Sequence, residues 1–528
     1  MLTAAENIAD AESFACDVLI VGAGAVGMAM AVDLARRGRS VTVLEAGPGA
    51  VSAQSQGYFE KARSVGRKLE GLYIGRFRAL GGTTNFWGGQ LVPFDPIVFG
   101  PRDWVDARAA WPITREELDP YYGRVLDLLG VSSARMSDDE VKTRLKIAPP
   151  APPEALSFFF TRWMPEPNVA TLFRGEIETS PNLRVVVGAP VVALAPGATP
   201  GAVAGAEVVD GRGRRLRFRG GEIVLANGTI EIARLLSLPY CDGSKTPWRG
   251  NPWLGRGFMD HVDFVAGEAT PIDKKRFHDL FDNGVVEGVK YTPKLKLSDV
   301  TQTREKLLNV ACHFLFNSSM ADDLVNAKIF VRGLLRGRLS GSPLDALRRL
   351  RTLATVGAPM ILRYLRHRRI YNFTDGGIQL RVTAEQRMVV ESGLRLLPEQ
   401  DDLGMPIAEI DWRVDGMEIE TVARFAEIVR DYLAAAGLAE TKLDARLVDR
   451  SPEMLATLDD ANHHMGMARM ADDPSDGVVD RNLKTHGADN LHVAGAAVYP
   501  STGFANPTFT AMALGLRLTD RLAAQARA

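Results

Sequence analysis

Cysteine is scarce in this chain of 528 residues, which has only Cys16, Cys241 and Cys312. The three stand far apart without C-x-x-C spacing, which argues against a disulfide framework and against a cysteine zinc site. Such cysteine usage is typical of a reducing compartment, so we predict a cytoplasmic location. The N-terminal residues start acidic and polar and lack the positive region of a secretory signal.

Net charge and long apolar runs are also missing. The 63 basic residues nearly balance 64 acidic residues, for a net charge of −1, so the chain has no overall basic field for nucleic acid. No stretch approaches 18 uncharged apolar residues, and we predict no membrane span. With 46% hydrophobic and 24% charged residues the composition is that of a globular protein, and 528 residues predict two or three domains.

The clearest local pattern lies in residues 17–47, "DVLIVGAGAVGMAMAVDLARRGRSVTVLEAG". A β-branched run leads into Gly22, Gly24 and Gly27, which have G-x-G-x-x-G/A spacing; a helical apolar period and a second strand ending in Glu45 follow. This order predicts a dinucleotide fold with the pyrophosphate at the helix N-terminus. Glu45 would accept hydrogen bonds from the adenosine ribose hydroxyls, which disfavours NADP; the motif leaves NAD and FAD open.

A second glycine cluster, "RALGGTTNFWGGQ", occupies residues 78–90. Gly81 and Gly82 permit close backbone approach, and small polar residues follow them. An NAD-binding domain does not need such a loop, whereas a flavin extends past the first motif and does. The other interpretation of the cluster is a tight turn in the core.

Together with later segments, these motifs resemble the glucose–methanol–choline (GMC) flavoprotein oxidoreductases. The resemblance is strongest at both ends of the chain, and the order of the segments matches the family. The later segments are "WPITREELDPYYGRVLDLLG" (111–130), "GEIVLANGTIEIARLL" (221–236), "NPWLGRGFMDHV" (251–262), "HHMGMARM" (463–470) and "GVVDRNLKTHGADNLHVAGAAVYPSTGFANPTFTAMALGLRLTDRL" (477–522).

The resemblance implies an α/β fold, α+β overall, with a Rossmann-like FAD-binding domain and a mixed-sheet substrate-binding domain, as in the GMC and p-hydroxybenzoate hydroxylase architecture. The implied segments are FAD-binding parts 1–100, 181–262 and 456–528, a cofactor-covering linker 101–180, and a substrate-binding domain 263–455.

Within the family, "GGTTNFW" and "GFANPTFTAMAL" look closest to the sugar-oxidising branch, which includes pyranose oxidases and bacterial glycoside oxidases. Phe86 stands where a fungal pyranose oxidase carries its flavin-linked histidine, which implies non-covalent FAD. Asn85 replaces a threonine near the flavin, and oxidase versus dehydrogenase stays open.

The implied reaction is oxidation of a sugar or glycoside hydroxyl by proton abstraction and hydride transfer to flavin N5, with O₂, a quinone or a protein carrier as electron acceptor. The alternatives are a dehydrogenase for a non-sugar alcohol and a GMC-fold lyase with non-redox FAD. The sequence does not indicate the oligomeric state.

Two adjacent histidines, His463 and His464, precede Gly466. One can be a catalytic base, both can be metal ligands, or both can be packing residues. Neighbouring residues on a strand or helix point apart, so H-H is poor ligand spacing and we predict no metal. The resemblance places the catalytic histidine three residues before the glycine, at His463, and the second catalytic position at Asn506.

This pair suits alcohol oxidation. A neutral imidazole, with an unperturbed pKa of about 6.5, accepts a hydroxyl proton, and an asparagine amide donates to the developing alkoxide. Another interpretation of Asn506 is an Asn-Pro turn at the start of a helix. Both interpretations can hold, because the N-terminus of that helix would stabilise a reduced flavin. We further expect His464 and Gln379 near the substrate.

The residues expected to contact FAD gather at the glycine motifs and at the start of the last helix. They are Gly22, Gly24, Ala25, Gly27, Glu45, Ala46, Gly81, Gly82, Thr83, Asn85, Phe86, Trp87, Val192, Ala226, Gly495, Asn506, Pro507 and Thr508.

In the middle of the chain, residues 394–414 alternate as sheet strands do, and residues 415–438 have the period of an amphipathic helix. The segment 328–369 is rich in arginine and leucine, with Asp345 its only acid. It can lie on an anionic membrane or dock an electron-accepting partner. We favour the simpler interpretation, a solvated helical hairpin that caps the substrate domain.

Overall fold

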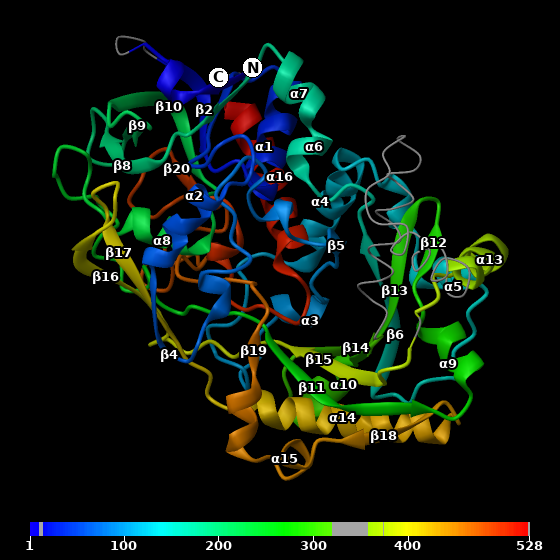
Figure 1. The fold of residues 1–528 in the computed structure, drawn as a ribbon. Coiled ribbons are helices and arrows are strands. Elements are labelled where there is room, and N and C mark those ends of the chain that lie inside the picture. Colours follow the sequence, from blue (N-terminus) through cyan, green and yellow to red (C-terminus); the bar gives the residue numbers. More distant parts are fainter. Residues whose placement is uncertain (10–13, 319–356, 373, 526–528) are drawn as a thin grey trace.

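The computed structural model describes residues 1–9, 14–318, 357–372 and 374–525 and contains two large sheets (Figure 1). One sheet carries the glycine motif and lies in the upper part of Figure 1, beside α1 (Ala25–Arg36) and α16 (Pro507–Gln525). The other lies to the right of it and below, with α14 (Met417–Ala435) in the lower part of the view. This α/β architecture confirms the predicted fold class.

The first sheet has eight strands within the described residues, in the order β1-β7-β3-β2-β10-β9-β8, with β20 paired to β10. The pairs β2·β3, β3·β7 and β2·β10 are parallel, and β8 and β9 add an antiparallel edge. The strands are β1 (Leu2–Ala4), β2 (Phe14–Val21), β3 (Val41–Leu44), β7 (Leu183–Val187), β8 (Val191–Pro196), β9 (Val203–Val209), β10 (Arg215–Leu225) and β20 (Leu491–Val493).

The predicted strand–turn–helix–strand order is confirmed, because α1 follows β2 directly and leads to β3. Strand β10 continues through a turn into α8 (Thr229–Leu236), as the segment 221–236 predicts. Parallel β2, β3 and β10 end at one edge of the sheet, so the turns that follow them gather there.

The second sheet has nine strands within the described residues, in the order β18-β11-β15-β14-β13-β6-β5, with β12 on β13 and β19 on β11. Its main pairs are antiparallel, and α14 packs against β11, β14, β15 and β18. The strands are β5 (Gln90–Leu91), β6 (Leu156–Trp163), β11 (Val262–Pro271), β12 (Gly284–Val286), β13 (Val289–Leu297), β14 (Val310–Phe316), β15 (Ile378–Ala384), β18 (Ala439–Leu443) and β19 (Asp459–Asp460).

A small third sheet joins β16 (Gly393–Gln400), β17 (Pro406–Trp412) and β4 (Arg63–Gly66). The alternating segment 394–414 therefore forms two strands, and the amphipathic period that follows forms α14, as expected. The predicted domain boundaries remain a proposal. Two strands cross the predicted boundaries. Strands β5 and β6 come from segments 1–100 and 101–180, but they belong to the nine-stranded sheet.

Most of the basic segment 328–369 lies outside the described residues. Its end forms α13 (Ala358–His367), on which Ile361, Leu362 and Leu365 are exposed. Arg363 contacts Asp279 and Asp282 through ion pairs of 3.0 Å each. Within the part of the chain that the structure describes, every helix is too short or too polar to be a candidate membrane span.

Candidate active site

A cavity of ≈ 440 Å³ lies where β2, β3 and β10 end. Most residues expected to contact FAD line it, from the glycine motif at one end to the start of α16 at the other. The expected residues that line the cavity are Gly22, Gly24, Ala25, Glu45, Ala46, Gly82, Thr83, Phe86, Trp87, Ala226, Gly495, Asn506, Pro507 and Thr508.

Four expected residues, Gly27, Gly81, Asn85 and Val192, lie behind this lining. A Cβ on Gly27 would stand 2.0 Å from the Gly22 carbonyl oxygen, so this glycine serves the packing of α1 on β2. The Gly81 N–H donates to the Ala23 carbonyl at 3.0 Å and ties the two glycine loops together.

Asn85 is held within its own loop. Its Nδ2 donates to the carbonyls of Leu80 and Gly82 at 3.0 and 2.9 Å, and its Oδ1 accepts from Asn168 Nδ2 at 3.0 Å. On β8, Val192 is buried, and its neighbour Val191 lines the cavity, because successive side chains point to opposite faces of a sheet. These residues shape the cavity from behind.

The protein backbone that lines the first cavity suits the binding of a dinucleotide. A Cβ placed on Gly24 would meet nothing within 4 Å, so Gly24 leaves open space on the cavity side of the turn. Gly24 is also the N-cap of α1 and provides no side-chain cap. The first-turn N–H groups of α1 have no partner inside the helix, and such groups bind phosphate.

Glu45 lies at the end of β3 and is buried. Its two carboxylate oxygens accept from the N–H groups of Ala23 and Gly47 at 3.0 and 2.8 Å. Burial raises its pKa to about 7. Each oxygen can accept a further hydrogen bond, and Glu45 lines the cavity, which suits ribose hydroxyls.

A second cavity of ≈ 330 Å³ lies against the nine-stranded sheet and is strongly polar. The two cavities meet, because Gln90, Ala461, Asn462, His463 and Asn506 line both. The predicted catalytic pair thus stands between a cavity built for a dinucleotide and a polar cavity large enough for a small substrate.

His463 and Asn506 contact each other directly. Asn506 Nδ2 lies 2.9 Å from His463 Nε2. An amide nitrogen only donates, so Nε2 is the acceptor and carries the lone pair. In a neutral imidazole the proton then sits on Nδ1. The lone pair of His463 therefore faces the place where the two cavities join.

His261 fixes this tautomer from behind. Its Nδ1 lies 3.0 Å from His463 Nδ1, with the two rings edge to face at 75°. His463 donates through Nδ1, so His261 accepts there and carries its own proton on Nε2. His261 is fully buried, and burial lowers its pKa well below the ordinary value.

Burial also keeps the two adjacent histidines neutral. Burial and then the nearby Lys294 ammonium lower the pKa of His463 to about 4. For His464, burial followed by Arg76 and His463 lowers the pKa to about 3. A neutral His463 is the form that accepts a proton, so at neutral pH the residue has the protonation state that a general base needs.

Asp260 anchors the histidine loop. Its carboxylate accepts from the N–H groups of Ala461 and His463 at 3.2 and 3.0 Å. Asp260, Asp460 and His464 form a group of potential metal ligands within the described residues. Asp460 accepts from the N–H groups of Glu70 and Gly71. Both carboxylates thus hold loops together, and burial raises the pKa of each.

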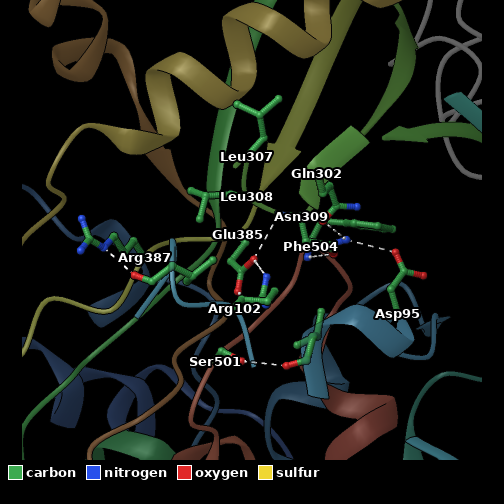
Figure 2. A network of polar contacts seen from close by, with 12 residues as sticks. Asp95, Arg102, Gln302, Leu307, Leu308, Asn309, Glu385, Arg387, Ser501 and Phe504 are labelled. Atoms are coloured by element: carbon green, nitrogen blue, oxygen red, sulfur yellow. Dashed lines mark hydrogen bonds and ion pairs between the residues drawn. The ribbon is translucent and has the colours of Figure 1, made fainter. Parts of the chain in front are cut away.

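The loop that carries Asn506 is held by the buried network of Figure 2. Arg102 forms two hydrogen bonds, of 2.6 and 2.7 Å, with the fully buried Glu385. Glu385 also accepts from the Asn309 N–H at 3.1 Å, and Asn309 Oδ1 accepts from the Phe504 N–H at 3.0 Å. The network joins β14 and β15 to the 501–506 loop and sets the position of Asn506.

The two expected substrate residues lie in different places. His464 lines the FAD cavity, and its Nε2 is 3.9 Å from Asp260 Oδ2. Gln379 lies on β15 in register with Leu315 and outside both cavity linings, whereas Arg381 and Thr383, two and four residues further on, line the second cavity. Its role as a substrate contact stays a prediction.

Several polar side chains of the candidate site lie outside the sequence-based expectations: His261 behind His463, and Asp263, Lys294, His313 and Arg381 in the second cavity. A signal for some of them exists in the sequence, because "VKYTPKLKL" and "IQLRVTA" alternate polar and apolar residues along β13 and β15. The alternation marks a polar face, but which strands share it depends on the sheet order.

Two family models match the chain. The model described as GMC oxidoreductase matches residues 391–515, and the one described as FAD dependent oxidoreductase matches residues 17–238. The first covers the histidine pair and Asn506, and the second covers both glycine motifs.

Relatives of known activity match over nearly the whole chain. The 2-methyl-1,2-propanediol dehydrogenase of Mycolicibacterium austroafricanum is 22% identical, over 96% of this chain and 94% of the relative. The fructose dehydrogenase large subunit of Gluconobacter japonicus is 23% identical, over 97% of this chain and 98% of the relative. A formate oxidase structure from Aspergillus oryzae RIB40, solved to study FAD modification, has a TM-score of 0.58 at 18% identity, over 98% and 100% of the two chains.

The matched family models, the full-length relatives and the dinucleotide cavity agree with one another. Residues 391–515 therefore match a GMC oxidoreductase domain, and the chain is an FAD-dependent oxidoreductase acting on CH–OH groups.

Proposed function

We propose that this enzyme oxidises a hydroxyl of a sugar, a glycoside or a related polyol to a carbonyl, with His463 as the base and Asn506 as the hydrogen-bond donor. The observation that carries this proposal is the meeting of the FAD cavity and the polar cavity at these two residues. FAD, when bound, accepts the hydride.

In the proposed reaction the substrate hydroxyl takes the place of the direct contact between His463 and Asn506. The hydroxyl donates to His463 Nε2, whose lone pair is set by the hydrogen bond from Nδ1 to His261. Asn506 Nδ2 donates to the same oxygen as it gains negative charge. His463 then holds the proton on Nε2 while the carbonyl forms.

The polarity of the second cavity supports a polyhydroxylated substrate. Amide, hydroxyl and charged groups converge on the space next to His463, and a sugar offers many hydroxyls to them. Besides His463 and Asn506, the polar side chains are Gln90, Thr161, Asp263, Lys294, His313, Arg381, Thr383, Asp460 and Asn462. The activities of the two full-length relatives, on fructose and on a small diol, agree with this substrate class.

We further propose that FAD is bound without a covalent link. Phe86 lines the FAD cavity, where it stacks on Phe77 with ring centroids 5.6 Å apart, and a phenyl ring offers no nucleophile. Acid precipitation of the holoenzyme would release all of the flavin into the supernatant. Flavin that stays with the precipitated protein would contradict this part of the proposal.

The experiment that tests the reaction is anaerobic mixing of the holoenzyme with sugars, glycosides, primary alcohols and sterols. Bleaching of the oxidised flavin absorbance by sugars or polyols is the expected result. Bleaching by aliphatic or sterol alcohols alone would contradict the proposed sugar or polyol substrate and indicate a non-sugar alcohol instead. Turnover without bleaching would point to the lyase alternative.

The electron acceptor is identified by mixing the reduced enzyme with O₂, a quinone or a protein carrier and measuring the rate at which the flavin is reoxidised. A membrane contact through 328–369 and a cytoplasmic location stay predictions. Liposome flotation of the full chain and of a variant without 328–369 tests the contact, since equal flotation of the two would end that proposal. The solvated hairpin remains the interpretation we favour.

A further inference from the structure

The floor of the second cavity is a row of polar side chains across neighbouring strands. His313 on β14 pairs with Arg381 on β15, and Asp263 on β11 pairs with Thr383. On β13, Lys294 lies one position before Leu295, which pairs with Cys312, so the same register brings Lys294 opposite His313. Alternate residues of a strand share a face, and this face is the cavity floor.

The cavity floor has more cationic than anionic side chains. Arg381 Nε donates to Asp263 Oδ2 at 3.0 Å, so the only floor carboxylate among the described residues is engaged by one of the two cations. Asp460, at the cavity wall, is engaged by backbone N–H groups. Burial, Lys294 and Arg381 lower the pKa of His313 to about 3, so it is neutral.

Lys294 is the floor cation that is not in an ion pair within the described residues. Among the described residues its ammonium has no ion pair within 4.0 Å, although Asp263 attracts it from further away. Burial lowers its pKa to about 8. Lys294 is half-buried and lines the cavity, so an anion bound there would reach its ammonium and offset the cost of its partial burial.

We propose that the substrate is a hydroxy compound with a carboxylate, such as a sugar acid, and that Lys294 and the terminal N–H groups of Arg381 bind this carboxylate. The inference rests on the proposed oxidation at His463. Lys294 and Arg381 flank His313 on the floor and can meet one carboxylate, whereas Asp460 at the wall adds negative charge and disfavours a doubly charged phosphate. The hydroxyl to be oxidised then lies toward His463 and Asn506, which line the same cavity.

The test compares matched pairs of compounds: gluconate with glucitol, and glucuronate with glucose. Anaerobic flavin reduction gives a half-saturating concentration for each, and calorimetry on the holoenzyme gives binding without turnover. Because a hydrogen bond to a charged group is the interaction gained, the acids are expected to bind about tenfold to a hundredfold more tightly. Glucose 6-phosphate forms a third arm, expected to bind more weakly than glucuronate.

Three variants test whether Lys294 is the residue that causes the preference for the acid. Lys294→Met is expected to lose the preference for the acid, and Lys294→Arg to retain it. Lys290→Met is the matched control, because Lys290 lies on the same strand face, with Nζ 3.7 Å from the Trp163 ring centroid and outside the second cavity. FAD content and melting temperature report whether each variant folds.

Equal or tighter binding of glucitol and glucose by the wild type would overturn the inference whatever the variants do. So would an unchanged acid preference in Lys294→Met, or tighter binding of the phosphate. A flavin bleached by neutral polyols in any of these cases leaves the proposed oxidation standing. A flavin that none of the compounds bleaches, combined with no binding by calorimetry, overturns both.

Discussion

The Nδ1 atoms of His261 and His463 lie 3.0 Å apart, and one of them must donate to the other. Asn506 occupies the Nε2 side of His463 as a donor, so the proton between the two histidines belongs to His463. His261 lies outside the linings of both cavities, and by accepting from Nδ1 it stabilises the His463 tautomer whose Nε2 can accept a proton. We propose that it is a positioning residue.

Replacing His261 separates this role from simple packing. In His261→Phe the acceptor is lost, His463 samples both tautomers, and anaerobic flavin reduction is expected to slow about tenfold to a hundredfold, as for other residues that orient a ligand or base. In His261→Asn the side-chain carbonyl can accept from Nδ1, and the rate is expected to recover most of this loss.

A spectroscopic readout completes this test. Nitrogen NMR of ¹⁵N-histidine-labelled protein, with the His463 signals assigned through His463→Gln, is expected to show the Nδ1-protonated tautomer in the wild type and in His261→Asn. A wild-type rate in His261→Phe, together with an unchanged tautomer, would remove His261 from the mechanism.

The turn after β2 gives a second prediction. A Cβ on Gly24 meets no protein atom within 4 Å, so Gly24→Ala is expected to fold normally. The methyl group would occupy space that the cofactor needs, and loss of one phosphate contact lowers FAD affinity about tenfold to a hundredfold. The control is Gly49→Ala, which is equally open and outside the cavity lining. Equal FAD affinity in the two variants would contradict the placement of the cofactor.

The buried pair of Figure 2 gives a prediction about stability. Arg102 and Glu385 are 1% and 0% exposed. Removing one partner leaves a buried charge alone, so Arg102→Met is expected to lower the free energy of unfolding by about 3–5 kcal/mol. The double variant Arg102→Met with Glu385→Leu is expected to regain much of that stability. A double variant no more stable than the single one, by thermal unfolding, would contradict this account.

The FAD half of the molecule was predictable because its signals are local. Gly22, Gly24 and Gly27 stand in one turn, and Glu45 follows the next strand, so spacing alone places them at one edge of a parallel sheet. The family resemblance, rather than local spacing, indicates His463 and Asn506, and the structure brings their side chains into contact.

The substrate side was less predictable because its geometry depends on strand order. Lys294, His313 and Arg381 come from three strands that are up to 87 positions apart in the chain, and only the β13-β14-β15 order places them side by side. Gln379 illustrates the limit: it lies on the polar face of β15, as Arg381 does, but beyond the cavity. A periodic pattern identifies the face of a strand but not the position along it.

The pH dependence of flavin reduction follows from the burial of the base. His463 accepts a proton only when neutral, and its pKa is lowered to about 4 by burial and by Lys294. Its other polar neighbours are the neutral His261, the amide of Asn506 and the buried Asp260, which accepts from the His463 backbone N–H. With a neutral polyol, the rate is expected to stay flat at neutral pH and to fall only as the pH drops toward 4. A loss centred near 6.5, the value of a free imidazole, would contradict this prediction.

The most direct test of the central claim is single-turnover flavin reduction by His463→Ala under anaerobic conditions, with the best polyol of the panel. Loss of a general base predicts a rate about a hundredfold to ten-thousandfold below the wild type, at unchanged FAD content. A flavin that His463→Ala still bleaches at the wild-type rate would contradict the assignment of His463 as the base.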